Sequence, residues 1–359
     1  MTNDQRQMTK LISGLWASIW IGAMSASAIA QTTPEPFVPR FPGDVPPRSV
    51  EPLPPQRQLE ERSQPQTDFR IPALQEDYTG ALWVGSWIGL TRIDPNTGRI
   101  LARVGLPNYT IGALAQDKVG RIWVGTAEGL VRVDPRSNEM TAYNFSLPSN
   151  RILSLLVDER GYLWVGTDRG LALISPDEGL LMTTVQELPG VSANALTVDD
   201  NGQLWVGTLE GLTRIDTASA FVIGRISDIP GNVVQTLTTG PDGKLWVGTP
   251  NSLLVINPES REIERSVTVM RGRSVTSVQF AEDSSVWVGT DNGLWKLRAE
   301  TGAVLGQIPD LPSSRVLSLS PDTGNKLWVG TSQGLAWVSL TTGRVRPHFA
   351  FVSEPPGTF

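Results

Sequence analysis

The chain has 359 residues, including 12 Trp, 35 Gly and 27 Pro, with one His, no Cys and a formal net charge of −6. The absence of Cys excludes disulfides, thiolate catalysis, Cys-ligated zinc and a lipidated Cys anchor, and a single His excludes a metal site built from several His side chains. Because nucleic-acid binding needs clustered Lys and Arg, this acidic balance also argues against a nucleic-acid partner.

Residues 1–30 have the pattern of a secretory signal peptide. Arg6 and Lys10 precede an apolar run over residues 11–24, and the small residues Ala28 and Ala30 follow in an A-x-A arrangement. We expect cleavage after Ala30 and export to the periplasm or the cell surface, where disulfides are optional. The alternative is an uncleaved segment that tethers the protein to a membrane, because apolar and small residues run for about 20 positions.

Residues 31–66 are predicted to form a disordered, Pro-rich linker. The segment contains ten prolines, which remove backbone donors and block helices and central strands. An extended, partly polyproline-like spacer is therefore expected. The alternative is a docking segment for a partner or for the cell wall.

A segment similar to Leu-Trp-Val-Gly-Thr-x-x-Gly-Leu occurs seven times within residues 67–353. Its tryptophans are spaced by 40 residues once and by 41 residues five times. Regular self-similarity of this period indicates a repeat architecture. We interpret the seven tryptophans as core residues, because an indole removes a large apolar area from water. They are Trp83, Trp123, Trp164, Trp205, Trp246, Trp287 and Trp328.

Each repeat predicts four short strands and no helix. The first strand is apolar, as in Ile152–Leu156, and the second is the Leu-Trp-Val-Gly-Thr run. The third follows Thr-x-x-Gly, as in Leu130–Val133, and a weaker fourth follows a turn, as in Met140–Phe145. Seven such units predict an all-β, seven-bladed β-propeller with four antiparallel strands per blade over residues 67–353, followed by a C-terminal tail over residues 354–359.

The positions around each Trp predict how the blades pack. A large residue stands nine positions before the Trp and a small one ten positions before it, so the inner strand presents them to opposite neighbouring blades. Gly always stands two positions after the Trp, where we expect another backbone to come close. The first unit begins with an inner strand (Phe69–Gln75) and the last ends with an outer one (Arg344–Phe351). Closure of the ring should therefore rest on packing between blades 1 and 7.

The repeat resembles the two-component regulator propeller repeat. Residues 147–152 (Leu-Pro-Ser-Asn-Arg-Ile), Asp158, Gly161 and residues 163–171 match its pattern almost fully. In that family the repeats usually form the extracytoplasmic sensor of membrane-bound regulators, some of which respond to oligosaccharides. The resemblance therefore implies a binding or sensing propeller. A more distant similarity is to virginiamycin B lyase-like propellers, whose catalytic His we do not match in this chain.

Propeller function usually lies on one open face, at the loops that lead into the inner strands and those between the second and third strands. These loops carry Arg, carboxylates, amides and two aromatic residues, a mixture that suits a peptide, a protein or a glycan. Trp87 is the most distinctive, because it lies outside the Trp position of the repeat. The candidate ligand-binding residues are Arg70, Trp87, Tyr109, Glu128, Asn150, Arg151, Asp168, Arg169, Glu210, Asn232, Asn251, Arg273, Asp291, Asn292, Arg315 and Gln333.

The sequence favours an exported, non-catalytic propeller that binds a ligand or acts as an interaction scaffold at the channel mouth, and we expect a monomer without cofactor or metal. The alternatives are a periplasmic hydrolase or lyase that uses carboxylates and Arg at the channel mouth, and a purely structural component of the envelope. Glu128 and Glu210 could face each other across a channel, as glycoside hydrolysis requires. No catalytic residue is assigned, because the sequence contains neither a nucleophile elbow nor a Ser-x-x-Lys motif.

Overall fold

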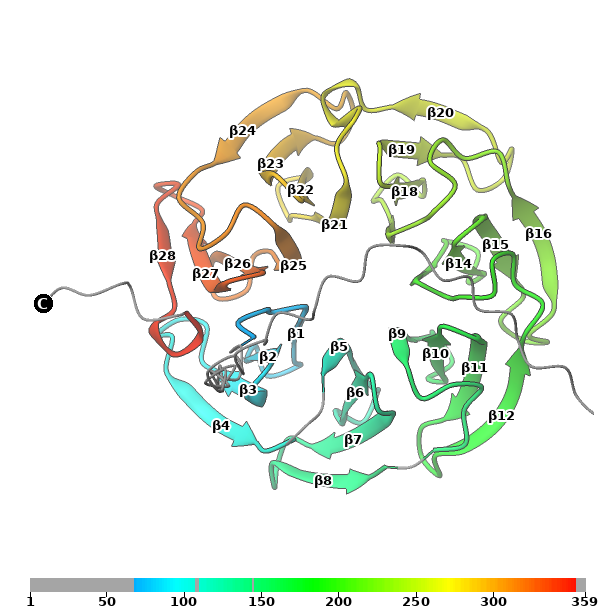
Figure 1. Ribbon diagram of the computed structural model, residues 1–359, viewed down its shortest axis with the longest axis horizontal. Helices are drawn as coiled ribbons and strands as arrows, with labels where there is room; N and C mark the ends of the chain where they lie inside the picture. The colour runs from blue at the N-terminus through cyan, green and yellow to red at the C-terminus, as the bar shows by residue number, and fades with distance from the viewer. Residues whose placement is uncertain (1–67, 107–109, 144, 353–359) are drawn as a thin grey trace, which may run out of the picture. The chain divides into compact units, whose positions relative to one another are not determined.

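The computed structural model describes residues 68–106, 110–143 and 145–352, so the predicted signal peptide, Pro-rich linker and C-terminal tail lie outside the described residues. The described residues form seven four-stranded antiparallel sheets that stand as blades around a common centre (Figure 1). The predicted seven-bladed β-propeller is therefore confirmed. The described helical structure consists of two three-residue 3₁₀ turns, η1 (Thr268–Met270) and η2 (Phe349–Phe351).

Each blade uses its four strands in sequence order, from the centre of the ring to the rim. The inner strands are β1 (Ala73–Glu76), β5 (Ile111–Gln116), β9 (Ile152–Val157), β13 (Ala195–Val198), β17 (Thr236–Thr239), β21 (Val275–Phe280) and β25 (Val316–Ser320). The second strands are β2 (Leu82–Ser86), β6 (Ile122–Thr126), β10 (Leu163–Thr167), β14 (Leu204–Thr208), β18 (Leu245–Gly248), β22 (Ser285–Thr290) and β26 (Lys326–Thr331). The third strands are β3 (Gly89–Ile93), β7 (Leu130–Asp134), β11 (Gly170–Ser175), β15 (Gly211–Ile215), β19 (Leu253–Ile256), β23 (Gly293–Arg298) and β27 (Gly334–Ser339). The outer strands are β4 (Ile100–Val104), β8 (Glu139–Ala142), β12 (Leu180–Val185), β16 (Val222–Ile226), β20 (Ile263–Ser266), β24 (Val304–Ile308) and β28 (Val345–Pro347).

The ends of some strands differ from those expected. The first inner strand begins at Ala73 rather than Phe69, because Pro72 has no N–H to donate to a neighbouring strand. The last outer strand ends at Pro347, after which the chain turns into η2 rather than continuing extended to Phe351. The outer strand of blade 2 ends at Ala142 and does not reach Phe145.

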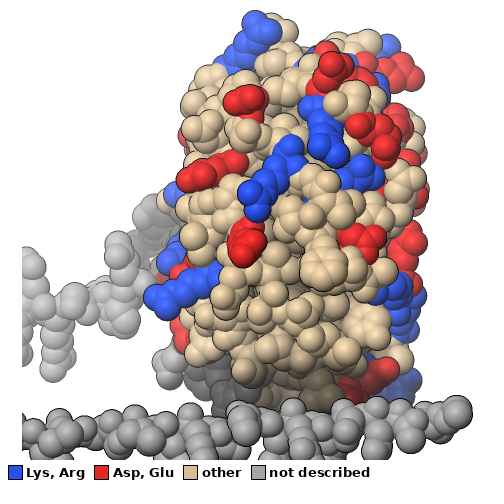
Figure 2. All heavy atoms as spheres, turned by 90° about the vertical axis from the view of Figure 1, so that its right-hand side faces the viewer, with Lys and Arg blue, Asp and Glu red and all other residues tan. Residues whose placement is uncertain are grey.

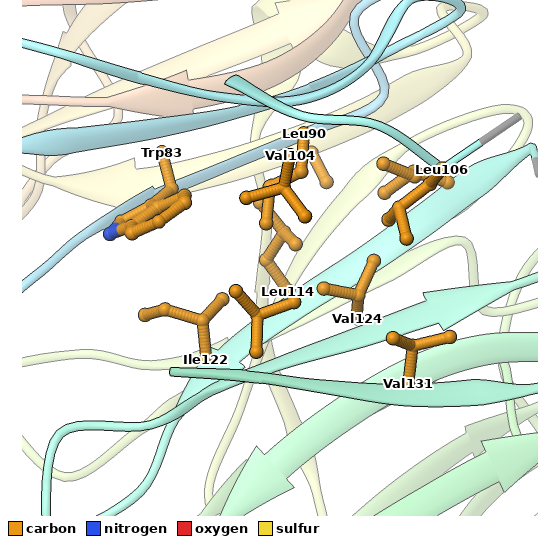
Figure 3. Packing of buried hydrophobic residues seen from close by; sticks show 11 residues of the cluster. Trp83, Leu90, Val104, Leu106, Leu114, Ile122, Val124 and Val131 are labelled. Atoms are coloured by element: carbon orange, nitrogen blue, oxygen red, sulfur yellow. The ribbon is translucent and has the colours of Figure 1, made fainter. Parts of the chain in front are cut away.

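The core lies between neighbouring blades. The seven repeat tryptophans are all buried, with exposed fractions of 0–3%. Trp83 and Leu90 of blade 1 pack against Leu114, Ile122 and Val124 of blade 2 (Figure 3). Each blade therefore covers its Trp with the apolar face of the next blade, which confirms that these tryptophans are structural.

In four blades a buried Asp six residues before the Trp accepts a hydrogen bond from the indole. The indole N–H donates to the carboxylate of this Asp in the pairs Trp83–Asp77 (2.9 Å) and Trp205–Asp199 (2.8 Å), and blades 2 and 3 repeat the bond. The guanidinium of Arg92 lies 5.5 Å from the Trp83 ring centre and pairs with Asp77 at 2.6 Å. Burial alone would raise the pKa of Asp77, but hydrogen bonds from Thr79, Trp83 and Ala81 outweigh it and lower the pKa below its ordinary value.

A Gly stands two residues after each Trp. The atoms nearest to a Cβ added at this Gly belong more often to side chains than to the backbone. A Cβ at Gly85 would lie 2.6 Å from Cγ2 of Ile111, and one at Gly289 would lie 2.6 Å from Cγ1 of Val316. Both partners are β-branched residues at the start of the next blade's inner strand. The expected close approach of a backbone holds in blades 3, 5 and 7, where a carbonyl of the next blade is among the nearest atoms.

Blades 1 and 7 close the ring without sharing a strand, as expected. Blade 1 consists of β1–β4 and blade 7 of β25–β28. Ile71 donates its N–H to the carbonyl of Thr331 at 3.0 Å, and the hydroxyl of Ser318 donates to the carbonyl of Ile71 at 2.8 Å. Ile71 also packs with Leu82, Trp328 and other residues of both blades in one buried cluster. The same contacts that join the other blades therefore complete the ring.

The rim carries charges of both signs. Figure 2 views the rim on the right-hand side of Figure 1 and shows Lys and Arg interspersed with Asp and Glu around a broad uncharged area. The outer strands contribute exposed apolar residues such as Leu180, Met182 and Ile223.

Candidate functional site

Two sets of loops share one face of the ring, here called the mouth face. The blade-linking loops lead into the inner strands, and the Thr-x-x-Gly loops join the second and third strands. Backbone hydrogen bonds tie the two sets together within a blade, as from Ala127 N–H to the Thr110 carbonyl (3.0 Å) and from Ser332 N–H to the Arg315 carbonyl (3.0 Å). The sequence-predicted loops therefore do lie side by side.

The Thr of the repeat shapes the Thr-x-x-Gly loop. In blade 2 the Thr126 hydroxyl donates to the Gly129 carbonyl at 2.7 Å and accepts the Glu128 N–H at 3.1 Å. Gly129 has a φ of +142°, in the region that L side chains rarely adopt. The two residues between Thr and Gly consequently lie at the surface, as Ala127 and Glu128 do, and their identities differ from blade to blade.

A pocket of about 460 Å³ opens on the mouth face over blades 7, 1, 2 and 3. Its size falls within the range of roughly 300–1,000 Å³ that is typical of small-molecule sites. It is lined by Asp68, Arg70, Pro72, Ser86, Trp87, Thr110, Ile111, Gly112, Ala127, Arg151, Ile152, Leu153, Arg315, Leu317 and Ser332. Four of the residues predicted from the sequence thus come together in it, namely Arg70, Trp87, Arg151 and Arg315.

The three Arg residues occupy the same repeat position, thirteen residues before the Trp of blades 1, 3 and 7. Arg70 is paired with Asp68, and its Nε donates to both carboxylate oxygens at 2.8 Å. The Arg70 hydrogen bonds lower the pKa of Asp68, and the same pair raises the pKa of Arg70. Arg151 and Arg315 are exposed, and within the described residues neither forms an ion pair.

Trp87 stands at the edge of the pocket with 46% of its surface exposed. Its ring meets that of Phe69 edge to face, with 5.8 Å between the ring centres. An indole that is held by a neighbour and still half-exposed can stack on a ligand with little loss of side-chain entropy.

Sequence reasoning missed the apolar residues of the pocket, which stand eleven positions before the Trp. Pro72, Leu153 and Leu317 occupy this position in blades 1, 3 and 7. Blades 4 and 6 have Asn194 and Thr276 there, whose side chains donate to carbonyls of the next blade at 3.1 Å and 2.7 Å. This repeat position is therefore apolar in blades 1, 3 and 7 and polar in blades 4 and 6, a difference that is visible in the sequence.

Most of the other predicted residues occupy loops of the mouth face without lining the pocket. Glu128 accepts the Thr110 N–H at 3.1 Å, and Arg273 lies over the ring of Trp295 at 4.7 Å. Tyr109 lies outside the described residues. Those that do not line the pocket are Glu128, Asn150, Asp168, Arg169, Glu210, Asn232, Asn251, Arg273, Asp291, Asn292 and Gln333.

Among the residues that the structure describes, no three His, Asp or Glu side chains lie close enough together to hold a metal ion. Likewise, no helix in this part of the chain has the length and apolar character needed to cross a bilayer.

The comparisons with known proteins agree with this architecture. The family model of the two component regulator propeller matches residues 105–128, 146–169, 187–210 and 228–251. Each match runs from a blade-linking loop through the inner and second strands into the Thr-x-x-Gly loop of blades 2–5. No curated protein matches the chain in sequence.

Several solved structures share the fold. The extracellular domain of a hybrid two component system of B. thetaiotaomicron is 21% identical, with a TM-score of 0.66 over 77% of this chain and 41% of that chain. A second such domain from the same organism is 21% identical, with a TM-score of 0.64 over 76% and 40%. The chain thus spans about two fifths of the length of these domains.

A catalytically inactive virginiamycin B lyase from Staphylococcus aureus, solved with quinupristin, is 16% identical, with a TM-score of 0.64 over 75% of this chain and 94% of that chain. At these identities the likeness concerns the fold. Four segments of the chain thus match the two component regulator propeller repeat, and the described residues fold as a seven-bladed β-propeller.

Proposed function

We propose that the protein is an exported, non-catalytic propeller that senses or binds a ligand or partner in the pocket of the mouth face. One observation carries the proposal: the pocket gathers Arg70, Trp87, Arg151 and Arg315, which lie far apart in the sequence, around one apolar surface. Guanidinium groups and a half-exposed indole are side chains that bind ligands through directed hydrogen bonds and stacking.

The comparisons support this role indirectly. The repeats match a regulator family, and two of the similar structures are extracellular domains of two component systems. Together with the signal-peptide pattern of residues 1–30, this favours a module that works outside the cytoplasm. A peptide, a protein segment or a glycan remains the proposed class of ligand.

No observation favours the alternative of a hydrolase or lyase. Glu128 and Glu210, the carboxylates considered for such chemistry, do not line the pocket. The carboxylate in its described lining is that of Asp68, which is already bound to Arg70. Glycoside hydrolysis needs two carboxyl groups at a set separation. The described lining of the pocket does not provide this pair.

Thermal-shift screening against glycan and peptide panels tests the proposal. A ligand should raise the unfolding midpoint of the wild type and leave the midpoints of Trp87→Ala and Arg151→Ala unchanged. Arg169→Ala is the matched control, because Arg169 is exposed on the mouth face outside the pocket. Mass spectrometry should recover the ligand chemically intact. Equal shifts in the wild type and both pocket variants would contradict the proposed site.

A further inference from the structure

We propose that the pocket binds a carboxylate attached to an apolar group, as at the C-terminal residue of a peptide, and that Asp68 competes with this carboxylate from within the chain. The inference rests on the proposed function and specifies the chemistry of its ligand.

The charge of the pocket favours an anion. Arg70, Arg151 and Arg315 line it, and in its described lining one carboxylate, that of Asp68, opposes them. Arg presents parallel N–H groups that fit the two oxygens of a carboxylate, and such charge-assisted pairs are stronger than neutral hydrogen bonds. Within the described residues Arg151 and Arg315 form no ion pairs, so their guanidinium groups can bind a ligand.

Asp68 demonstrates that the pocket can hold a carboxylate. Nε of Arg70 donates to Oδ1 and Oδ2 of Asp68 at 2.8 Å each, and a terminal nitrogen of the same guanidinium donates to Oδ2 as well. The backbone N–H of Arg70 adds a bond to Oδ1 at 3.0 Å. One of the three guanidinium groups is thus occupied by an internal carboxylate, which repels an incoming one.

The apolar part of the lining favours an aliphatic or aromatic group next to the carboxylate. Pro72, Leu153, Leu317 and the ring of Trp87 contribute this surface. Two of the hydroxyl-bearing residues in the lining already have partners within the protein, because Ser86 donates to the Gly89 carbonyl and Ser332 is hydrogen-bonded to Ser313. An acidic sugar would bring many hydroxyl groups that need hydrogen-bond partners once they leave water. The C-terminal residue of a peptide with an apolar side chain matches the lining better, and capture of a terminal carboxylate is a recurring mode of peptide recognition.

Two probes that differ in one group test the inference, namely N-acetyl-Leu-Phe with a free carboxylate and its C-terminal amide. Calorimetric titration of the full chain should show at least about tenfold tighter binding of the acid, since hydrogen bonds to a charged group are worth about 1.5–3 kcal/mol. Arg151→Ala and Arg315→Ala should weaken binding of the acid about tenfold or more and change binding of the amide little.

Asp68→Asn supplies a test in the opposite direction. Removal of the internal negative charge should tighten binding of the acid several-fold and leave binding of the amide unchanged. Arg169→Ala should alter neither. Circular dichroism confirms that each variant folds, which is expected because Arg151, Arg169 and Arg315 are exposed.

The outcomes separate the two proposals. If acid and amide bind equally and Trp87→Ala abolishes both, the carboxylate inference is wrong and the proposed site stands. If both bind and no pocket variant changes their affinity, the proposed site is wrong as well. Stronger binding of an oligogalacturonate than of the peptide acid, or no binding of the acid to Asp68→Asn at millimolar concentration, overturns the inference.

Discussion

At the scale of single residues, each repeat Trp lies between two blades, and in four blades its N–H is satisfied by a buried Asp. Asp199 illustrates the arrangement, because it accepts the Trp205 indole N–H at 2.8 Å and the backbone N–H groups of Asn201 and Gln203 at 3.0 and 2.9 Å, and pairs with Arg214 at 3.1 Å. One carboxylate thereby fixes both the turn and the indole. The sequence pattern predicts the turn and the buried Trp, but the bond between them depends on side-chain directions that a pattern does not contain.

Asp199→Ala should lower the free energy of unfolding by about 3 kcal/mol, because it leaves a buried indole N–H and two turn N–H groups without their acceptor and removes one of the two carboxylates that pair with Arg214. Urea denaturation measures the change. Asp200→Ala is the matched control, since Asp200 is the exposed neighbour of Asp199, and it should cost well under 1 kcal/mol. Equal stability of the two variants would show that the Asp–Trp pair contributes nothing to the blade.

At the level of strands and blades, the sequence predicts the fold well because the Trp, the Gly and the apolar residues recur at fixed positions in every repeat. The strand that carries the Trp is found in all seven blades where it was expected. The predictions that failed concern strand ends, such as the start at Ala73 and the end at Pro347, where a proline or a contact with another blade decides. The expected backbone partner of the repeat Gly is found in blades 3, 5 and 7 but not in the others, since the register between neighbouring blades is set by tertiary packing.

Gly289→Ala tests that register. The added Cβ would lie 2.6 Å from Cγ1 of Val316 in the next blade, and overpacking of this kind costs about 1–3 kcal/mol. Gly306→Ala is the control, because Gly306 lies in β24 with no atom within 4 Å of an added Cβ. Val316→Ala combined with Gly289→Ala should be less destabilised than the sum of the single variants. Strict additivity in chemical denaturation would mean that the two residues do not touch.

At the scale of the whole molecule, ring closure creates the candidate site. Arg70 lies near the start of the described chain and Arg315 near its end, and they meet in one pocket because blade 7 packs on blade 1. All three Arg residues and Trp87 were among the candidates predicted from the sequence. The sequence does not distinguish them from the other candidates, because every blade has equivalent loops. The position of the pocket depends on which blades combine an Arg thirteen residues before the Trp with an apolar residue eleven before it.

The only His in the chain links the two closing blades and makes stability depend on pH. The N–H of His348 Nε2 donates to the Gly98 carbonyl at 2.7 Å, and Nδ1 accepts the Ala350 N–H at 3.4 Å, so the ring is neutral. Burial lowers the pKa of His348. The unfolded state therefore takes up a proton at higher pH than the folded state, and stability should fall as pH drops below about 6.5.

His348→Gln serves as the comparison for this pH effect. Its amide can donate to the Gly98 carbonyl but does not titrate, so the free energy of unfolding of the wild type should decline more between pH 7.5 and pH 5 than that of the variant. Parallel pH profiles of the two proteins would rule out a contribution from His348.

Binding in the mouth-face pocket is tested most directly by ¹⁹F NMR of the 5-fluorotryptophan-labelled protein, which follows the indole of Trp87. Trp87→Phe assigns its resonance, which belongs to an indole that is 46% exposed, whereas the seven repeat tryptophans are buried. Every ligand that stabilises the protein against unfolding should shift or broaden the Trp87 resonance and leave those of the repeat tryptophans in place. A stabilising ligand that leaves the Trp87 resonance unchanged would contradict the assignment of the mouth-face pocket as the binding site.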